Sequence, residues 1–133
     1  MNKLTKNELE IWKKYRKPST TFHKCKVNEL NISPANSEKH EYHKFALYHW
    51  KRKEKHNLLS ECEEIATGLR RDLVCLTCGG EIFEFETDVS RAVRFIPQAV
   101  NVIAIGWKFS DKKWVKAKSE ATSIKVKEYA EHP

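Results

Sequence analysis

The sequence predicts an α/β fold with the element order α-β-β-β-α-β, in which helices flank a mixed sheet. Three observations predict it. Residues 38–56 contain no glycine or proline and repeat aromatic residues at helical spacing. Residues 58–87 hold three short alternating segments separated by glycine turns, which is typical of an antiparallel meander. Residues 101–109 form an almost continuous apolar run, which is typical of a strand covered on both faces.

The remaining elements follow from local patterns. A short amphipathic helix is expected over residues 5–16, because apolar residues recur at helical spacing and Pro18 ends the pattern. Ser37 is the expected N-cap of the helix over 38–56. The other expected elements are strands over 58–66, 70–76 and 81–87, a helix over 89–96, a strand over 101–109, a helix over 111–121 and an edge strand over 123–129.

The domain organisation follows from composition. We divide the chain into a basic N-terminal helix and arm over residues 1–37 and an α/β domain over residues 38–133. No apolar segment approaches the roughly 20 residues that a membrane span needs. The N-terminus has no apolar signal-peptide segment. The sequence therefore predicts a cytoplasmic protein without a membrane partner.

Charge is sorted along the chain. Residues 61–90 carry eight acids and two arginines, whereas the segments on either side are basic and bring the formal net charge to +7. Basic flanks indicate a polyanionic partner such as DNA. Acids gathered within a basic chain either face solvent at strand edges or bind a divalent cation.

Three carboxylates are the candidates for such a cation. Glu84 and Glu86 alternate on one strand, about 7 Å apart on the same face. Asp72 lies on the preceding strand, and the glycine turn at 79–80 can bring it opposite that face. Carboxylates this close repel one another unless a cation lies between them, which predicts Mg²⁺ or Mn²⁺.

Residues 40–109 resemble the PD-(D/E)XK nuclease superfamily. The resemblance is carried by Thr67-Gly-Leu-Arg-Arg-Asp-Leu-Val74 followed by Glu81-Ile-Phe-Glu-Phe-Glu86, which are similar to small archaeal, viral and bacterial Holliday-junction-resolvase-like proteins. It implies a restriction-endonuclease-like core and a Mg²⁺-dependent deoxyribonuclease that hydrolyses phosphodiesters, branched or junction DNA included. It also implies a homodimer, because two strands must be cut.

The resemblance also implies residue roles. Asp72 would ligate the metal, Glu84 would be the motif acid, and Glu86 would stand where the family has its lysine. Alternatively, Glu86 is the motif acid and Asp88 occupies the lysine position. In either alignment the lysine is missing, and Arg91 or Arg94 would return a cation to the site. Glu61, Glu63 or Glu41 would be the additional acid that some members use. The implied catalytic set is Asp72, Glu84, Glu86 and Arg91, and the implied metal ligands are Asp72, Glu84, Glu86 and Glu61.

Basic residues near these motifs are candidates for phosphate contacts. Those at the end of the helix over 38–56 could equally complement the helix dipole. The candidate nucleic-acid-binding residues are Lys51, Arg52, Lys53, Arg70, Arg71 and Arg94.

Cys75-Leu-Thr-Cys78-Gly-Gly has the spacing of a zinc knuckle. A tetrahedral site needs two further ligands, for which His23 and Cys25 are candidates. Alternatively, Cys75 and Cys62 are small buried strand residues. Two other functions therefore stand beside the nuclease: a non-catalytic DNA-binding protein on a degenerate nuclease fold, and a zinc-stapled nucleic-acid-binding module.

Overall fold

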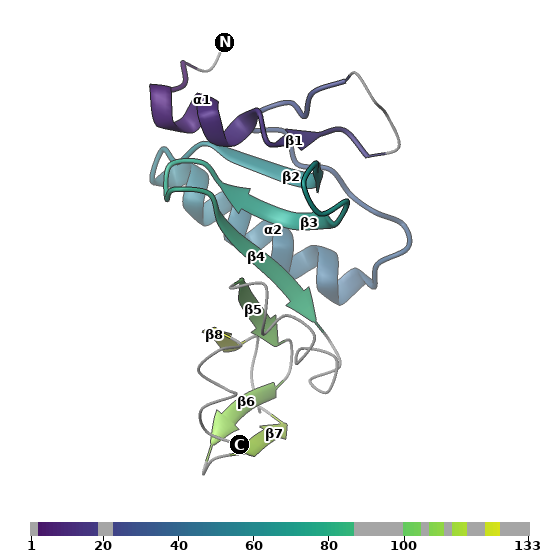
Figure 1. Cartoon of the computed structure of the whole chain (residues 1–133). Coiled ribbons are helices and arrows are strands. Elements are labelled where there is room, and N and C mark those ends of the chain that lie inside the picture. The colour runs from purple at the N-terminus through teal and green to yellow at the C-terminus, as the bar shows by residue number, and fades with distance from the viewer. Residues whose placement is uncertain are drawn as a thin grey trace.

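The structure is a computed structural model that describes residues 3–18, 23–86, 100–104, 107–110, 113–116 and 122–125. It is a small α/β protein built on a four-stranded antiparallel sheet with two helices (Figure 1). Its first six elements are α1 (Lys6–Trp12), β1 (Tyr15–Arg16), α2 (Glu38–Lys53), β2 (Leu58–Glu64), β3 (Arg70–Cys75) and β4 (Glu81–Glu86). The three strands β2, β3 and β4 confirm the predicted meander.

The sheet continues beyond β4 as a mixed sheet. Strand β5 (Asn101–Ala104) pairs parallel to β4, and β8 (Thr122–Lys125) pairs antiparallel to β5, which gives the order β1-β2-β3-β4-β5-β8. The helix expected over 89–96 lies outside the described residues.

The prediction of a helix over 111–121 is wrong. Residues 113–116 form strand β7 (Lys113–Lys116), which pairs with β6 (Trp107–Ser110) in a separate two-stranded sheet. The apolar run expected as one strand is accordingly divided between β5 and β6. Trp114 and Val115 have aromatic and β-branched side chains that favour a strand once a partner is available.

Both helices begin at side chains that satisfy their first backbone N–H groups. Thr5 and Glu8 form a capping box at α1, in which Thr5 Oγ1 accepts from the Glu8 N–H at 3.1 Å and Glu8 Oε1 accepts from the Thr5 N–H at 2.9 Å. At α2, Ser37 Oγ accepts from the His40 N–H at 3.1 Å, so the predicted N-cap is confirmed.

Helix α2 covers one face of the sheet, behind the strands in Figure 1. Its partly buried Leu47 and Tyr48 pack on a core from the strands. That core consists of Leu58, Leu73, Cys75, Phe83 and Phe85. Because α2 is anchored here, the side chains of its first turns are held over the adjacent ends of β3 and β4.

The opposite face is covered by the N-terminal segment. Tyr15 and Cys25 are buried against β2 and β3, and Leu4, Ile11, Trp12 and Val27 pack around them. A disulfide joins Cys25 to Cys62. The predicted N-terminal arm therefore packs on the sheet and shares its core, and Cys25 is not available as a zinc ligand.

The side-chain alternation of β2 breaks at Glu61, which has a φ of 50°. Leu59 belongs to the core beneath the N-terminal segment, whereas Glu61 lies 3.7 Å from Lys44 of α2. Regular pleating would place Leu59 and Glu61 on the same face. The left-handed backbone at Glu61 turns its carboxylate toward the helix instead.

Neither of the helices in the described residues is long and apolar enough to span a membrane.

Candidate functional site

Asp72 lies where β3 and β4 separate. The register between these strands runs from Cys75 opposite Glu81 to Leu73 opposite Phe83. One residue further along β3, Asp72 Oδ2 accepts the backbone N–H of Phe85 at 2.9 Å. The carboxylate thus takes the place of a main-chain acceptor and lies between the two strands.

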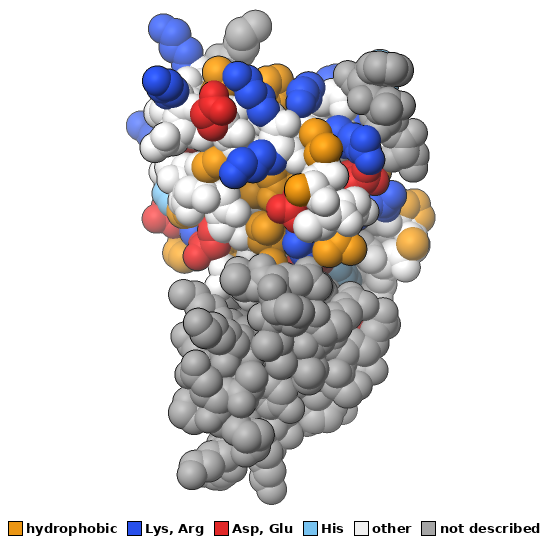
Figure 2. Space-filling model, viewed as in Figure 1, with side chains coloured by type: hydrophobic (Ala, Val, Ile, Leu, Met, Phe, Trp, Pro, Cys, Tyr) orange, Lys and Arg blue, Asp and Glu red, His pale blue; other side chains and the backbone are white. Residues whose placement is uncertain are grey.

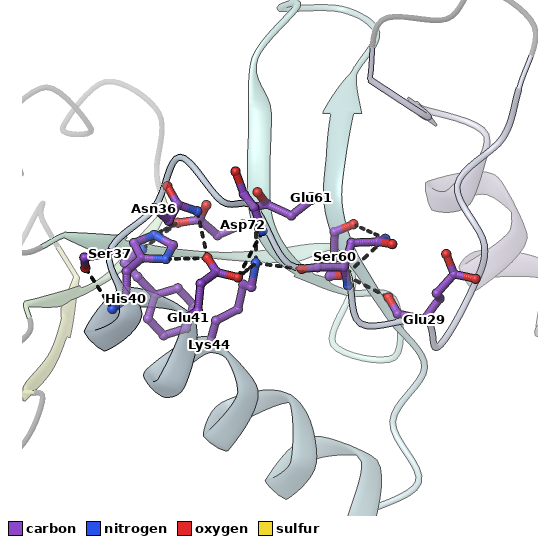
Figure 3. A network of polar contacts seen from close by, with 12 residues as sticks. Glu29, Asn36, Ser37, His40, Glu41, Lys44, Ser60, Glu61 and Asp72 are labelled. Carbon is purple, nitrogen blue, oxygen red and sulfur yellow. Dashed lines mark hydrogen bonds and ion pairs between the residues drawn. The ribbon is translucent and has the colours of Figure 1, made fainter.

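His40 connects Asp72 to α2. Its Nε2 lies 3.2 Å from Asp72 Oδ2, and its Nδ1 lies 3.0 Å from Glu41 Oε1 (Figure 3). Only the imidazolium form can donate to both carboxylates. Burial disfavours that charged form, but the hydrogen bonds and charges of Asp72 and Glu41 outweigh burial and raise the pKa of His40. Burial likewise opposes ionisation of Asp72, but the hydrogen bonds from His40 and the Phe85 N–H lower its pKa.

Lys44, one helical turn after Glu41, is 1% exposed. Its Nζ lies 2.7 Å from Glu41 Oε2 and 3.7 Å from Glu61 Oε2, and it donates to the Asn31 carbonyl oxygen at 2.8 Å (Figure 3). A lysine is rarely buried this completely without partners. The contacts place a fixed positive charge beside the carboxylates of α2 and β2.

Glu61 and Glu84 flank Asp72 from β2 and β4. Burial and the charge of neighbouring Asp72 raise the pKa of Glu84 to about 9, although Arg71 opposes this. Burial also raises the pKa of Glu61 to about 7, with Lys44 acting against it and Asp72 adding to it. Glu84 therefore keeps its proton at neutral pH and Glu61 is close to half-protonated, chiefly because burial disfavours their charged forms, whereas the lowered pKa of Asp72 leaves that carboxylate ionised.

Two carboxylate oxygens beside Asp72 lack hydrogen bonds within the described structure. Glu61 Oε2 and Glu84 Oε1 are buried and accept no hydrogen bond; each instead has a cation nearby, Lys44 at 3.7 Å and Arg71 at 3.6 Å respectively. Buried acceptors of this kind are uncommon. We call Glu41, Glu61, Asp72 and Glu84 the carboxylate cluster. The two oxygens without hydrogen bonds mark where a ligand could bind in it.

A basic groove leads to the cluster. It has a volume of about 420 Å³ and is lined by Glu61 together with residues of the N-terminal segment and β3. Its basic lining residues are Lys17, His23, Lys24, Lys26 and Arg70, and its acidic ones are Glu29 and Glu61. Figure 2 shows lysine and arginine side chains spread over the described part of the surface. A negatively charged chain lying in this groove would pass beside Glu61.

The structure brings some of the predicted site residues together and places others elsewhere. Asp72, Glu84 and Glu61 come together, and Glu86 is also buried near the end of β4. Arg91 and Arg94, as well as Asp88, lie outside the described residues. Arg70 is exposed and lines the groove.

Arg71 is not placed for the predicted phosphate contact. It is buried and ion-paired with Glu64 at 3.0 Å and with Glu84 at 3.6 Å. It lies opposite Cys62 of β2 in the strand register.

The basic end of α2 lies away from the cluster. Lys51, Arg52 and Lys53 come more than ten residues after His40, roughly 17–20 Å along the helix. Arg52 donates to the His56 carbonyl oxygen at 2.8 Å, and Lys51 Nζ lies 3.9 Å from Cys78 Sγ. The Arg52 contact favours the interpretation that Arg52 complements the C-terminal end of α2 rather than binding phosphate.

A second group lies beside Lys51. His56, Cys75 and Cys78 place one ligand atom each within 4.8 Å of one another. Among the described side chains, no other three of the histidine, cysteine and carboxylate type converge so closely. The zinc partners predicted for Cys75 and Cys78 are therefore corrected: Cys25 is in a disulfide, and His23 lines the basic groove.

Three functional candidates were missed in the sequence: His40, Lys44 and His56. His40 and Lys44 could have been found from the sequence, because residues four apart lie on one face of a helix. Glu41, which was already a candidate acid, lies between them. No sequence pattern connects His56 to Cys75 and Cys78, because the loop contact that joins them is tertiary.

Comparison of the chain with protein-family models, with curated proteins and with solved structures finds no match in any of the three. The functional interpretation therefore depends on the geometry of the two sites.

Proposed function

We propose that the protein is a divalent-metal-dependent DNA endonuclease whose site is the carboxylate cluster. The observation that carries the proposal is the position of Asp72, held between β3 and β4 beside Glu84 and beside Glu61, which lines a basic groove. The groove supplies charge for a phosphate backbone, and the cluster supplies oxygen ligands for Mg²⁺ or Mn²⁺.

The topology supports the same proposal. Helix α2 precedes the meander β2-β3-β4, and β5 lies parallel to β4 on its far side. This arrangement is the one expected of a restriction-endonuclease-like core, with Asp72 on the second core strand and Glu84 on the third. We propose that fold assignment on the order of strands and the position of the acids.

We propose that a hard divalent cation draws these carboxylates together, since no three of the described carboxylates converge as closely as His56, Cys75 and Cys78 do. Its ligands are carboxylates, Glu61 Oε2 and Glu84 Oε1 lack hydrogen bonds, and the pKa values of both residues are raised by burial first and by the charge of Asp72 as well. Asp72, Glu84 and Glu61 would hold the metal, with Glu86 as the fourth predicted ligand. A bound Mg²⁺ or Mn²⁺ would supply positive charge to a phosphate oxygen and lower the pKa of a bound water.

The chain's own residues would orient these groups. Asp72 Oδ2 contacts both His40 Nε2 of α2 and the backbone N–H of Phe85 in β4, and these two contacts fix its position. Lys44 keeps a positive charge beside Glu61. In the alignment that makes Glu84 the motif acid, Glu86 would stand where the family has lysine. We propose that Lys44 supplies the cation that the sequence motif lacks, so that Arg91 is not needed for that purpose.

Asp72→Asn is expected to reduce Mn²⁺-dependent nicking of supercoiled or branched DNA by about 100-fold or more. The substitution replaces one metal-binding oxygen by an NH₂ group, which donates hydrogen bonds and does not bind the metal. The assay compares initial nicking rates of folded proteins, and Glu81→Gln, at the other end of β4, is the matched control that should keep its rate. Equal nicking by wild type and Asp72→Asn would contradict the proposal.

DNA binding should weaken steeply as salt rises from about 50 to 300 mM, because bound cations are released from the phosphate backbone. Arg70→Gln in the groove is expected to reduce the slope of log K against log salt by about 1. Lys6→Gln on α1, outside the groove lining, is the matched control. A slope that changes equally in both variants would show that the groove is not the contact surface.

A second candidate function is a non-catalytic DNA-binding protein with the same groove. The observation that favours it is the hydrogen-bonded network of His40, Glu41 and Lys44, which already balances part of the carboxylate charge. Salt-dependent binding together with no metal-dependent nicking would select this function. A homodimer and an intracellular location stay predictions.

A further inference from the structure

His56, Cys75 and Cys78 converge from two loops at the end of the sheet away from Asp72. His56 lies between α2 and β2, Cys75 is the last residue of β3, and Cys78 lies in the turn before β4. Cys75 lies three positions after Asp72 along β3, about 10 Å in an extended chain. The group is therefore separate from the carboxylate cluster.

Backbone contacts hold the two loops together without help from the three side chains. Leu76 N–H donates to the Asn57 carbonyl oxygen at 2.9 Å, and Asn57 N–H donates to Thr77 Oγ1 at 2.8 Å. Gly80, with a φ of 87°, closes the turn, and a Cβ there would lie 3.1 Å from Cγ2 of Ile11. The ligand side chains consequently start from fixed backbone positions.

Ordinary hydrogen bonding does not account for this convergence. Cys75 Sγ and Cys78 Sγ each lie 3.4 Å from the same atom, His56 Nδ1. A ring nitrogen has either one lone pair or one hydrogen, so it makes one full hydrogen bond. A metal ion satisfies all three atoms at once. Metal–ligand lengths of a tetrahedral zinc site place nitrogen and sulfur about 3.6 Å apart, close to both observed separations.

We propose that His56, Cys75 and Cys78 form a zinc site. Two sulfurs and one imidazole nitrogen suit Zn²⁺, whereas Mg²⁺ requires oxygen ligands. Since the described residues supply three ligands and a tetrahedral ion needs four, we assign the fourth position to water. The bound ion joins the α2–β2 loop to the β3–β4 turn.

Lys51 adds charge complementarity to this site. Its Nζ lies 3.9 Å from Cys78 Sγ and 5.4 Å from the centroid of the Phe83 ring. A cation in this position balances part of the negative charge that two zinc-bound sulfurs carry. Lys51, which the sequence predicted as a phosphate contact, is thereby assigned to the zinc site.

The test is zinc binding to the whole chain after removal of metals with a chelator. We expect one Zn²⁺ per chain, a rise in melting temperature on adding zinc, and thiolate-to-metal absorption when Co²⁺ replaces zinc. Azide should shift the Co²⁺ spectrum by replacing water. Cys75 and Cys78 are the free cysteines among the described residues, so zinc should slow their reaction with a thiol reagent and a chelator should restore it.

Cys78→Ser and His56→Gln should each weaken zinc binding by about 100-fold or more. Cys78 is exposed in a turn, so its serine variant should fold, which circular dichroism checks. His49→Gln, an exposed histidine of α2, and Asp72→Asn should keep full affinity. Full affinity in Cys78→Ser or His56→Gln, a wild type that binds no zinc, or a Co²⁺ spectrum unchanged by azide would overturn the assignment. Because Asp72→Asn affects only the proposed nuclease, either proposal can fail without the other.

Discussion

Replacing Lys44 by methionine is expected to destabilise the protein by about 3–5 kcal/mol at neutral pH. The ammonium group is buried between Glu41 and Glu61 and also satisfies the Asn31 carbonyl oxygen. Methionine fills a similar volume but leaves the buried Glu61 carboxylate without a cation, and Glu41 keeps only His40. The cost arises from these lost ion pairs rather than from lost packing. Urea denaturation of the metal-free protein measures it.

Lys53→Met is the matched control, because Lys53 lies on the same helix and is exposed. Its effect should stay within about 0.5 kcal/mol. Adding Glu61→Gln to Lys44→Met should recover part of the stability, because the carboxylate that lost its cation is then gone; a double-mutant cycle gives the coupling. Equal stability of Lys44→Met and Lys53→Met would contradict the buried ion-pair network.

Replacing Glu84 by glutamine is expected to stabilise the metal-free protein at alkaline pH, by roughly 2 kcal/mol or more near pH 8 to 9. The pKa of Glu84 is raised from 4.5 to about 9 in the folded protein, by burial first and by the charge of Asp72 second. Glutamine resembles the protonated carboxyl group at every pH. The variant therefore avoids the cost of ionising Glu84 beside Asp72.

The direction of the pH dependence follows from proton binding. Between the unfolded pKa and about pH 9 the folded protein retains a proton on Glu84 that the unfolded chain has lost. Stability of the wild type contributed by this group is therefore present at low pH and is lost as pH rises through this window. Glu84→Gln should flatten the curve, with the two proteins converging near pH 4.5.

Denaturation curves at several pH values, in the presence of a chelator, measure this difference. Glu81→Gln, at the half-exposed start of the same strand, should change stability by no more than about 0.5 kcal/mol. A Glu84→Gln protein that is less stable than wild type at alkaline pH would show that the ionised carboxylate is stabilised by Arg71 more than it is opposed by Asp72.

Local patterns were sufficient for the elements of the core. The alternating segments and glycine turns predicted β2, β3 and β4, and Ser37 marked the start of α2, because strand pleating and helix capping depend on residues close in sequence. The order of the strands also followed, since a glycine turn joins neighbours. Asp72 and Glu84 could therefore be expected on adjacent strands before any tertiary contact was known.

Only the tertiary structure decided what surrounds them. The left-handed backbone at Glu61 reversed the face of its carboxylate, and the packing of α2 brought Lys44 against it. The folded loops, rather than any spacing, joined His56 to Cys75 and Cys78. Pairing with β6 made residues 113–116 a strand. Each of these results depends on contacts between distant segments, whose free energy outweighs the local preferences that a sequence pattern records.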